Sequence, residues 1–242
     1  MAGDEGAALR VKPLYRGVRE ALVRRIAEGV WQPGQVLPSE FEIAADLGVS
    51  QGTVRKALDE MTAERLVVRR QGRGTYVARH DDERILFQFF KLTPDSGDRR
   101  FPESRVLGVE RLPADARAAE RLGVPAGEGL VAIERVRFVG GIAAIVERIV
   151  VAEALYPGLA ERLLPNNLYE LYAAEFGVTI AAAPERVKAV AAGAREVERL
   201  GLAPGTPLLA IDRIATAIDG RIAEWRVSVC RTDELHYLCE LP

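Results

Sequence analysis

The chain has 242 residues, of which 48% are hydrophobic and 28% charged, which fits two globular domains of ordinary size. Its two Cys and two His are too few for the usual zinc sites, so neither a metal nor another cofactor is expected. No apolar run reaches membrane-spanning length and no secretory signal opens the chain, which predicts a cytoplasmic protein without a membrane partner.

The formal net charge of −2 is unevenly divided along the chain. Residues 1–80 hold 13 Lys and Arg against 10 Asp and Glu, a charge of +3, whereas residues 81–242 hold 20 against 25, a charge of −5. A basic first part and an acidic second part would favour one orientation on DNA and keep the second part away from the phosphates.

Three helices are predicted in the first eighty residues. An amphipathic helix is expected over residues 14–28, because its apolar side chains recur at helical spacing. Ser39, followed three residues later by Glu42, is typical of a capping box that starts a second helix. Ser50 would cap a third helix over residues 51–64. The two short helices, joined by a tight turn at a glycine, predict a helix-turn-helix whose second helix reads bases.

A β-hairpin is predicted after the third helix. Residues 66–70 and 75–77 have strand character, and the turn between them holds Arg73 flanked by Gly72 and Gly74. The glycines let the tip approach a phosphate backbone or enter a minor groove, and nearby arginines add positive charge. The hairpin is therefore interpreted as the wing of a DNA-binding domain, although the helical pattern alone would also fit a helical hairpin of another function.

Three strings in this region resemble the winged-helix domain of the GntR family of bacterial regulators. They are Leu-Pro-Ser-Glu from residue 37, Thr-Val-Arg-Lys-Ala-Leu from residue 53 and Gly-Arg-Gly-Thr-Tyr-Val from residue 72. The resemblance implies a winged helix-turn-helix DNA-binding domain over residues 10–79. The positions assigned to DNA contact are Ser39, Gln51, Thr53, Arg55, Lys56, Arg70, Gln71, Gly72, Arg73 and Gly74.

Two positions depart from the pattern of that family. Phe41 stands where many members carry an Arg that contacts DNA, and we interpret it as an apolar packing residue. Gln51 stands where Arg is frequent at the head of the recognition helix. Gln pairs bidentately with adenine whereas Arg prefers guanine, so the operator is expected to differ from the usual one.

Residues 80–103 have the Pro, Gly and charge density of a linker and are expected to form the hinge between two domains. Within this segment, the apolar residues 85–90 are predicted to dock as a strand. Lys91 is interpreted as a solvated side chain, with a binding role as the less favoured alternative.

The second part of the chain contains an internal repeat. Residues 121–136 reappear at residues 199–214, offset by 78 positions, and each copy is predicted to be a helix followed by a β-hairpin. The hairpins are expected over residues 130–138 with 142–151 and 208–217 with 221–230, after helices over residues 115–122 and 195–200. The repeat suggests one antiparallel sheet with quasi-twofold symmetry and helices on one side, an α+β fold.

Further elements are predicted outside the repeat. Strands over residues 105–111 and 178–192 would widen the sheet, and residues 168–176 read as a helix in which Tyr172 is a core residue.

The symmetry of the repeat distinguishes two arginines. Arg135 matches Arg213 in the second copy, whereas Arg137 matches Ala215, so only the first copy carries two Arg on one strand face. These charges would either form cross-strand ion pairs on a solvated sheet face or bind a carboxylate or phosphate in a pocket. In the second case, Glu147 and Glu224 would accept hydrogen bonds from hydroxyl or amide groups of the ligand.

Residues 104–242 resemble the ligand-sensing UTRA domain of the HutC subfamily of GntR regulators, whose fold is that of chorismate lyase. The resemblance rests on four strings, at residues 132–138, 147–150, 167–172 with 176–178, and 207–213. By position, the resemblance implies an effector pocket lined by Arg135, Arg137, Glu147, Asn167, Tyr169 and Glu224. Asn167 replaces a frequent Ser, and Cys230 replaces a Tyr that is frequent in sugar-phosphate sensors, so a sugar phosphate is not assumed.

The favoured function is a homodimeric transcription regulator, most simply a repressor, that binds a palindromic DNA operator and responds to a small acidic metabolite. No catalytic residue is identified. The alternative is a lyase-like enzyme fused to a DNA-binding domain, which the single histidine of the second domain supports little. A third reading is an architectural DNA binder with an inert second domain.

Overall fold

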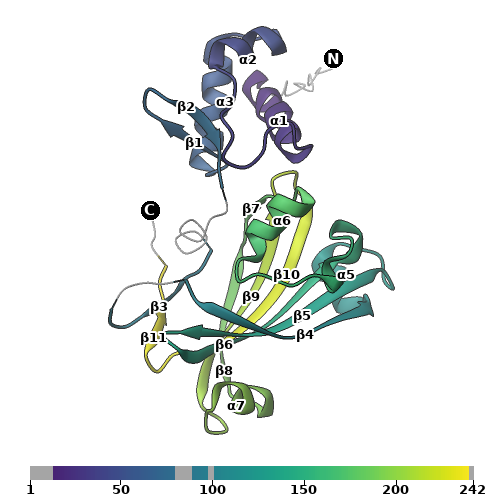
Figure 1. Cartoon of the computed structure of the whole chain (residues 1–242), viewed down its shortest axis with the longest axis vertical. Coiled ribbons are helices and arrows are strands. Elements are labelled where there is room, and N and C mark those ends of the chain that lie inside the picture. The colour runs from purple at the N-terminus through teal and green to yellow at the C-terminus, as the bar shows by residue number, and fades with distance from the viewer. Residues whose placement is uncertain (1–12, 80–88, 98–100, 240–242) are drawn as a thin grey trace, which may run out of the picture. The chain divides into compact units, whose positions relative to one another are not determined.

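The computed structural model describes residues 13–79, 89–97 and 101–239. The chain divides into two compact units, Met1–Ala78 and Arg79–Pro242 (Figure 1). None of the helices in the described ranges is long and apolar enough to cross a membrane.

The first unit is a three-helix domain with a β-hairpin, as the sequence predicts. Its elements are α1 (Leu14–Ala27), α2 (Glu40–Leu47), α3 (Gln51–Ala63), β1 (Val67–Arg70) and β2 (Gly74–Val77). Both α1 and α2 contact α3, and the fully buried core residues between them include Leu22, Val54 and Met61. The helix-turn-helix and the antiparallel β1–β2 wing are thus confirmed.

The two caps predicted for α2 and α3 are both present. Ser39 Oγ accepts a hydrogen bond from the Glu42 backbone at 3.2 Å, while the Glu42 carboxylate accepts one from the Ser39 backbone at 2.8 Å. Ser50 accepts from the backbone of Thr53 at the start of α3. Gly48 ends α2 at φ 64°, a left-handed conformation that other residues resist, so it makes the tight turn.

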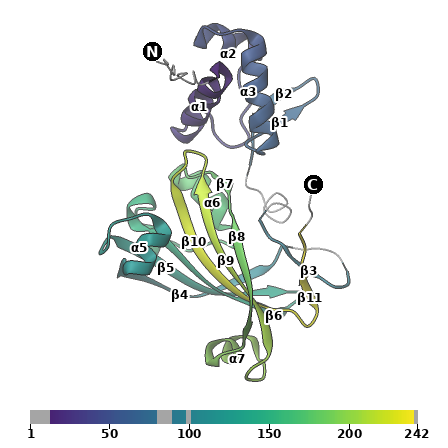
Figure 2. The ribbon, with the colours of Figure 1, turned by 180° about the vertical axis from the view of Figure 1, so that it is seen from behind.

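The second unit is built on a seven-stranded antiparallel sheet in the order β4-β5-β6-β10-β9-β7, with β8 also pairing β9. Figure 2 shows the long β9–β10 hairpin from behind. The strands are β4 (Glu103–Pro113), β5 (Gly129–Val139), β6 (Ile142–Ala152), β7 (Ile180–Ala182), β8 (Glu185–Ala191), β9 (Pro207–Ala217) and β10 (Ile222–Arg231). The helices are α5 (Ala116–Leu122), α6 (Leu168–Phe176) and α7 (Ala194–Leu200), and two 3-10 turns lie at Glu153–Leu155 and Leu159–Glu161.

The helix and the first strand of the internal repeat have the same bounds in both copies. The bounds of α5 and β5 become those of α7 and β9 when 78 is added to each residue number. The β5–β6 and β9–β10 hairpins meet at the β6–β10 pair in the middle of the sheet. The predicted quasi-twofold α+β architecture is therefore confirmed.

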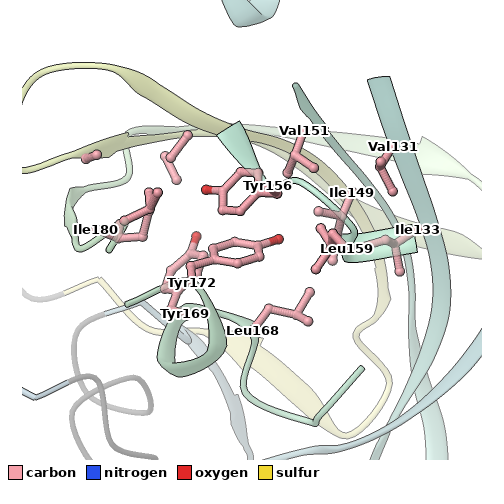
Figure 3. Close-up of a cluster of buried hydrophobic side chains, with 14 of the residues drawn as sticks. Val131, Ile133, Ile149, Val151, Tyr156, Leu159, Leu168, Tyr169, Tyr172 and Ile180 are labelled. Atoms are coloured by element: carbon pink, nitrogen blue, oxygen red, sulfur yellow. The ribbon is translucent and has the colours of Figure 1, made fainter. Parts of the chain in front are cut away.

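Helices cover both faces of the sheet, which corrects the expectation of helices on one side only. The repeat helices do share a face, because α5 packs on Leu130 and Ala132 and α7 packs on Val136 through Leu200. The opposite face carries α6, whose Tyr172 lies in one buried cluster with Ile133 and others (Figure 3). Adjacent residues of β5 point to opposite faces, so the strand supports both layers.

Part of the predicted linker belongs to the second unit. Residues 92–94 form β3 (Leu92–Pro94), which pairs with β11 (Leu235–Tyr237), and Glu103 already begins β4. Phe89 and Phe90 are buried but not in a strand, while the rest of the predicted strand lies outside the described residues. Burial of these apolar side chains outweighs the linker-like composition around them.

The predicted strand over residues 178–192 is split into β7 and β8. Pro184 lies between them and cannot donate a ladder hydrogen bond, which accounts for the break.

Candidate functional site

The ten positions predicted to face DNA all lie on or near the surface of the first unit. Nine are exposed, and Thr53 is half-buried because its hydroxyl hydrogen-bonds Ser50 at 2.8 Å. Lys56 lies over the ring of Tyr15 at 4.3 Å, and the Arg70 guanidinium lies over Tyr76 at 4.8 Å. These aromatic contacts hold two cations at the surface without neutralising them.

An exposed ion-pair network connects the recognition helix with the wing. Glu40 on α2 accepts from Arg55 Nε at 3.0 Å and also pairs with Arg69 on β1 at 3.4 Å. The hydrogen bond and the charge of Glu40 raise the pKa of Arg55. Arg69, which was not among the predicted DNA contacts, also pairs with Asp59. The network fixes the direction of Arg55 while leaving it exposed.

The wing tip has the backbone conformation that its glycines permit. Gly72 and Gly74 have φ values of 70° and 102°, and Tyr76 donates a hydrogen bond from its hydroxyl to the Arg73 carbonyl at 3.1 Å. A side chain at Gly74 would be strained and would also approach Val36 at 3.3 Å.

The interpretation of Phe41 as a packing residue is wrong. Its side chain is 72% exposed, on the first turn of α2 beside Glu40. Sequence alone could not distinguish the two faces of this short helix at that position.

The second unit has a pocket on the sheet face that carries α6. Arg135 and Arg137 enter it from β5, Glu147 from β6, Arg213 from β9 and Arg226 from β10. Cross-strand register explains the convergence, because Arg135 is paired with Glu147 and Arg213 with Arg226 on adjacent strands. All five side chains are buried, so this sheet face is not solvated, although Arg135 and Glu147 do form a cross-strand ion pair.

The two repeat copies place different charges at corresponding positions. In the first copy Arg135 donates to its cross-strand partner Glu147 at 2.5 Å. In the second copy the cross-strand partner of Arg213 on β10 is another cation, Arg226, and Arg213 instead donates to Glu185 on β8 at 2.7 Å. The copies share their backbone but differ in charge, which concentrates guanidinium groups in the pocket.

Glu147 is the central carboxylate of the pocket. Besides Arg135, it accepts a hydrogen bond from Ser228 at 3.0 Å and has Arg226 at 3.7 Å and Arg137 at 3.9 Å. Burial alone would raise the pKa of Glu147, but attraction by the arginines outweighs it and lowers the pKa below its usual value. The carboxylate therefore stays charged and interacts with several cations at once.

Arg137 is the least compensated of these cations. It donates to Ser104 Oγ at 3.1 Å and to the Pro102 carbonyl at 3.3 Å, and its nearest carboxylate, Glu147, is 3.9 Å away. Its guanidinium also lies over the ring of Phe101 at 5.0 Å. Burial lowers the pKa of Arg137 well below its usual value, and repulsion from Arg135 adds to the effect. A bound anion would stabilise the charged form of Arg137, which burial and like-charge repulsion destabilise.

Glu224 is not at the pocket wall, although it was assigned to the ligand. It is fully buried, and both of its oxygens are engaged by Arg226 at 2.8 Å. The hydroxyls of Tyr169 and Tyr172 also donate to it. Its role in this arrangement is to hold Arg226, whose pKa rises because attraction by Glu224 and Glu147 outweighs burial.

Asn167 and Tyr169 do line the pocket, at the start of α6. Asn167 caps the helix by accepting from the Glu170 backbone at 3.2 Å, and the Tyr169 ring meets Phe89 edge to face at 5.3 Å. Lys91 also lines the pocket and is half-buried, so its interpretation as a solvated linker residue is wrong. Tyr172 is fully buried, as predicted.

Several pocket residues were not identified from the sequence. The repeat identifies Arg213 only as the match of Arg135, yet the symmetry that relates the two copies brings both to the centre of the sheet. The others include Glu185, Ser228 and the aromatic residues Phe89, Phe90, Phe101 and Tyr237.

The comparisons with known proteins agree with both units. The description "Bacterial regulatory proteins, gntR family" matches residues 14–77, and the UTRA domain matches residues 98–236. The chain is 30% identical over 233 residues to the HTH-type transcriptional repressor NagR of Bacillus subtilis (strain 168), which covers 95% of this chain and 96% of that protein.

Two further comparisons cover nearly the whole chain and the second unit, respectively. The mannosyl-D-glycerate transport/metabolism system repressor MngR of Escherichia coli (strain K12) is 27% identical over 232 residues, covering 93% of this chain and 95% of that protein. The crystal structure of the ligand-binding domain of a GntR-family regulator from Bordetella bronchiseptica matches with a TM-score of 0.60 and 34% identity, covering 64% of this chain and 99% of that one. The chain therefore belongs to the GntR family of bacterial regulatory proteins, carries a UTRA domain and is a DNA-binding transcriptional regulator.

Proposed function

We propose that the protein is a cytoplasmic homodimeric repressor that binds a palindromic operator through α3 and the β1–β2 wing. A small anion, bearing a carboxylate or phosphate, enters the pocket of the second unit and lowers operator affinity. Dimerisation follows from the few base pairs that one recognition helix can read, since a twofold pair multiplies that discrimination.

The observation that carries the proposal is the excess of cations in the buried pocket. Four arginines, at positions 135, 137, 213 and 226, share three carboxylates, Glu147, Glu185 and Glu224. Arg137 is held mostly by neutral acceptors and ring faces. Guanidinium groups recognise carboxylates and phosphates bidentately, so an anion is the ligand that this charge distribution favours.

The size of the pocket supports a link between binding and regulation. The cavity has a volume of about 30 Å³, room for little more than a water molecule or two, so an anion must displace side chains in order to enter. Phe89 and Phe90, near the start of the second unit, are among the lining residues. A ligand that displaces Phe89 and Phe90 would favour one conformation of the chain over another. The coupling free energy between effector binding and operator binding is typically about 1–3 kcal/mol.

We propose binding without catalysis. A general acid or base works best when its pKa lies near neutrality. In the pocket, burial raises the pKa values of Cys230 and Tyr169, while the arginines lower that of Glu147. The shifts of these three groups lead away from neutral pH, whereas that of Arg137 leads toward it. Among the relatives, the system of MngR is named for mannosyl-D-glycerate, a carboxylate, which supports an anionic effector.

Thermal unfolding of the full chain tests the effector class. Phosphate, lactate, D-glycerate and glycerol 3-phosphate are compared with the neutral lactamide and glycerol. At least one anion should raise the melting temperature further as its concentration increases, whereas its neutral counterpart should not. Equal responses to anions and neutral compounds would contradict the proposal.

Operator binding tests the remainder of the proposal. DNA selected by the full chain from a random library should contain two inverted half-sites, and sedimentation should give a dimer on DNA. The stabilising anion should then weaken binding to that DNA in fluorescence anisotropy. A single half-site occupied by a monomer would contradict the homodimer.

A further inference from the structure

Asn166 places an unused polar atom at the pocket. It lies one residue before the N-cap of α6, lines the pocket, and its backbone oxygen accepts from Arg135 Nη1 at 3.2 Å. Its side-chain Oδ1 is buried and has no hydrogen-bond partner among the residues that the structure describes. A buried acceptor without a donor is costly and uncommon in native proteins, so it is a natural contact for a ligand.

The contact with Arg135 determines where a ligand donor would have to be. An anionic group held by Arg135 lies next to Asn166, because the guanidinium already touches the backbone of that residue. A donor that reaches Oδ1 must therefore be close to the anionic group, one or two carbons away. The surrounding arginines disfavour an ammonium group by like-charge repulsion, whereas a neutral hydroxyl carries no such cost.

We propose that Asn166 Oδ1 accepts a hydrogen bond from a hydroxyl group one or two carbons from the anionic group of the effector. Asn166 is then a residue that determines specificity: it selects hydroxylated anions over their deoxy counterparts. The inference rests on the proposed anion site, and it adds a second recognised group and the residue that recognises it.

Matched pairs of small anions test the preference in the full chain. Calorimetric titration compares each enantiomer of lactate with propionate, and glycerol 3-phosphate with n-propyl phosphate, so both sources of the charge are covered. The hydroxylated member of at least one pair should bind about 5- to 100-fold more tightly, because its deoxy analogue leaves the acceptor buried and unpaired. Equal affinities within both pairs would overturn the proposal.

Variants at Asn166 separate its hydrogen bond from its bulk. Asn166→Leu should bring the affinity ratio of the preferred pair close to one, whereas Asn166→Asp keeps an acceptor and should keep the preference even if both affinities fall. The control is Leu163→Ala, which lies in the same loop with a side chain that is 94% exposed, and it should retain the wild-type ratio.

The outcomes distinguish this inference from the proposed function. If Asn166→Leu retains the preference in a folded protein, Asn166 is not the recognising residue. If Asn166→Leu does not fold, a lost preference in Asn166→Asp overturns the acceptor role. If none of the four kinds of anion binds, the anion site itself is wrong. If the anions bind with equal affinity within each pair, only the role of Asn166 fails.

Discussion

The two units use arginine in opposite environments. In the first unit, the side chains of Arg55 and Arg69 are 58% and 38% exposed and share Glu40. In the second, Arg135 and Arg137 are 2% and 3% exposed. An exposed pair contributes little to stability and is readily exchanged for DNA phosphates, whereas a buried cation requires a partner. Arginine therefore makes exchangeable contacts on the surface of the first unit and fixed, buried contacts in the pocket of the second.

The largest effect is expected at the central carboxylate of the pocket. Glu147→Gln removes the charge that Arg135, Arg137 and Arg226 share, and leaving buried cations unpaired should cost about 3–5 kcal/mol of unfolding free energy. Denaturation is followed through Trp225, which is the only Trp left after Trp31→Phe and so reports on the second unit. The exposed Glu175, paired with Arg162, gives a control: Glu175→Gln should cost less than about 1 kcal/mol.

Lowering the pH should also destabilise the protein through Glu147. Because the pKa of Glu147 is lowered in the folded state, its contribution to stability is fully present above the usual carboxyl pKa of 4.5 and is lost as the pH falls below it. Unfolding of the Trp225 reporter between pH 7 and pH 3 should show this loss, and Glu147→Gln should show a smaller one. The same pH dependence in both proteins would remove Glu147 from the explanation.

A smaller effect is expected at the DNA surface. Arg55→Ala should weaken operator binding by about 1–3 kcal/mol if Arg55 contacts a base, while the stability of the first unit changes little.

Arg70→Ala should instead reduce the salt dependence of operator binding, with a slope of log affinity against log salt lower by about one. Unchanged operator affinity and salt dependence after both substitutions would contradict docking through α3 and the wing.

The smallest effect is expected at the first helix cap. Ser39→Ala removes the hydroxyl that accepts from the Glu42 backbone, which should cost about 0.5–2 kcal/mol in the first unit. Trp31 reports on this unit when Trp225 is replaced by Phe. Ser39→Asp, which keeps an acceptor, should restore most of the loss, and no difference between Ala and Asp would exclude a capping role.

Local features of both units were predictable from the sequence. Caps at Ser39 and Ser50 fix helix starts through hydrogen bonds within three residues, so their effect can be read along the chain. The repeat likewise predicts two helix-hairpin copies, because similar sequences form similar local structure.

Pairings between distant segments were not predictable. The contact of Arg213 with the Phe89 carbonyl joins residues 124 apart, and the pairing of β3 with β11 joins segments at opposite ends of the unit. No local pattern encodes such partners, which explains why Arg213 and Glu185 were missed and why residues 89–97 resembled a linker. Phe41 shows the same limit, since one apolar residue on a short helix is compatible with either face.

The most direct test of the account is anion affinity after Arg137 loses its charge. Arg137→Met keeps a long apolar side chain at this position but removes the guanidinium that lies over Phe90 and Phe101, the least compensated cation of the pocket. In calorimetric titrations of the full chain with the most stabilising anion, we expect at least about tenfold weaker binding, together with a second unit that is equally or more stable. Wild-type affinity in Arg137→Met would contradict the claim that the surplus charge of the pocket binds the effector.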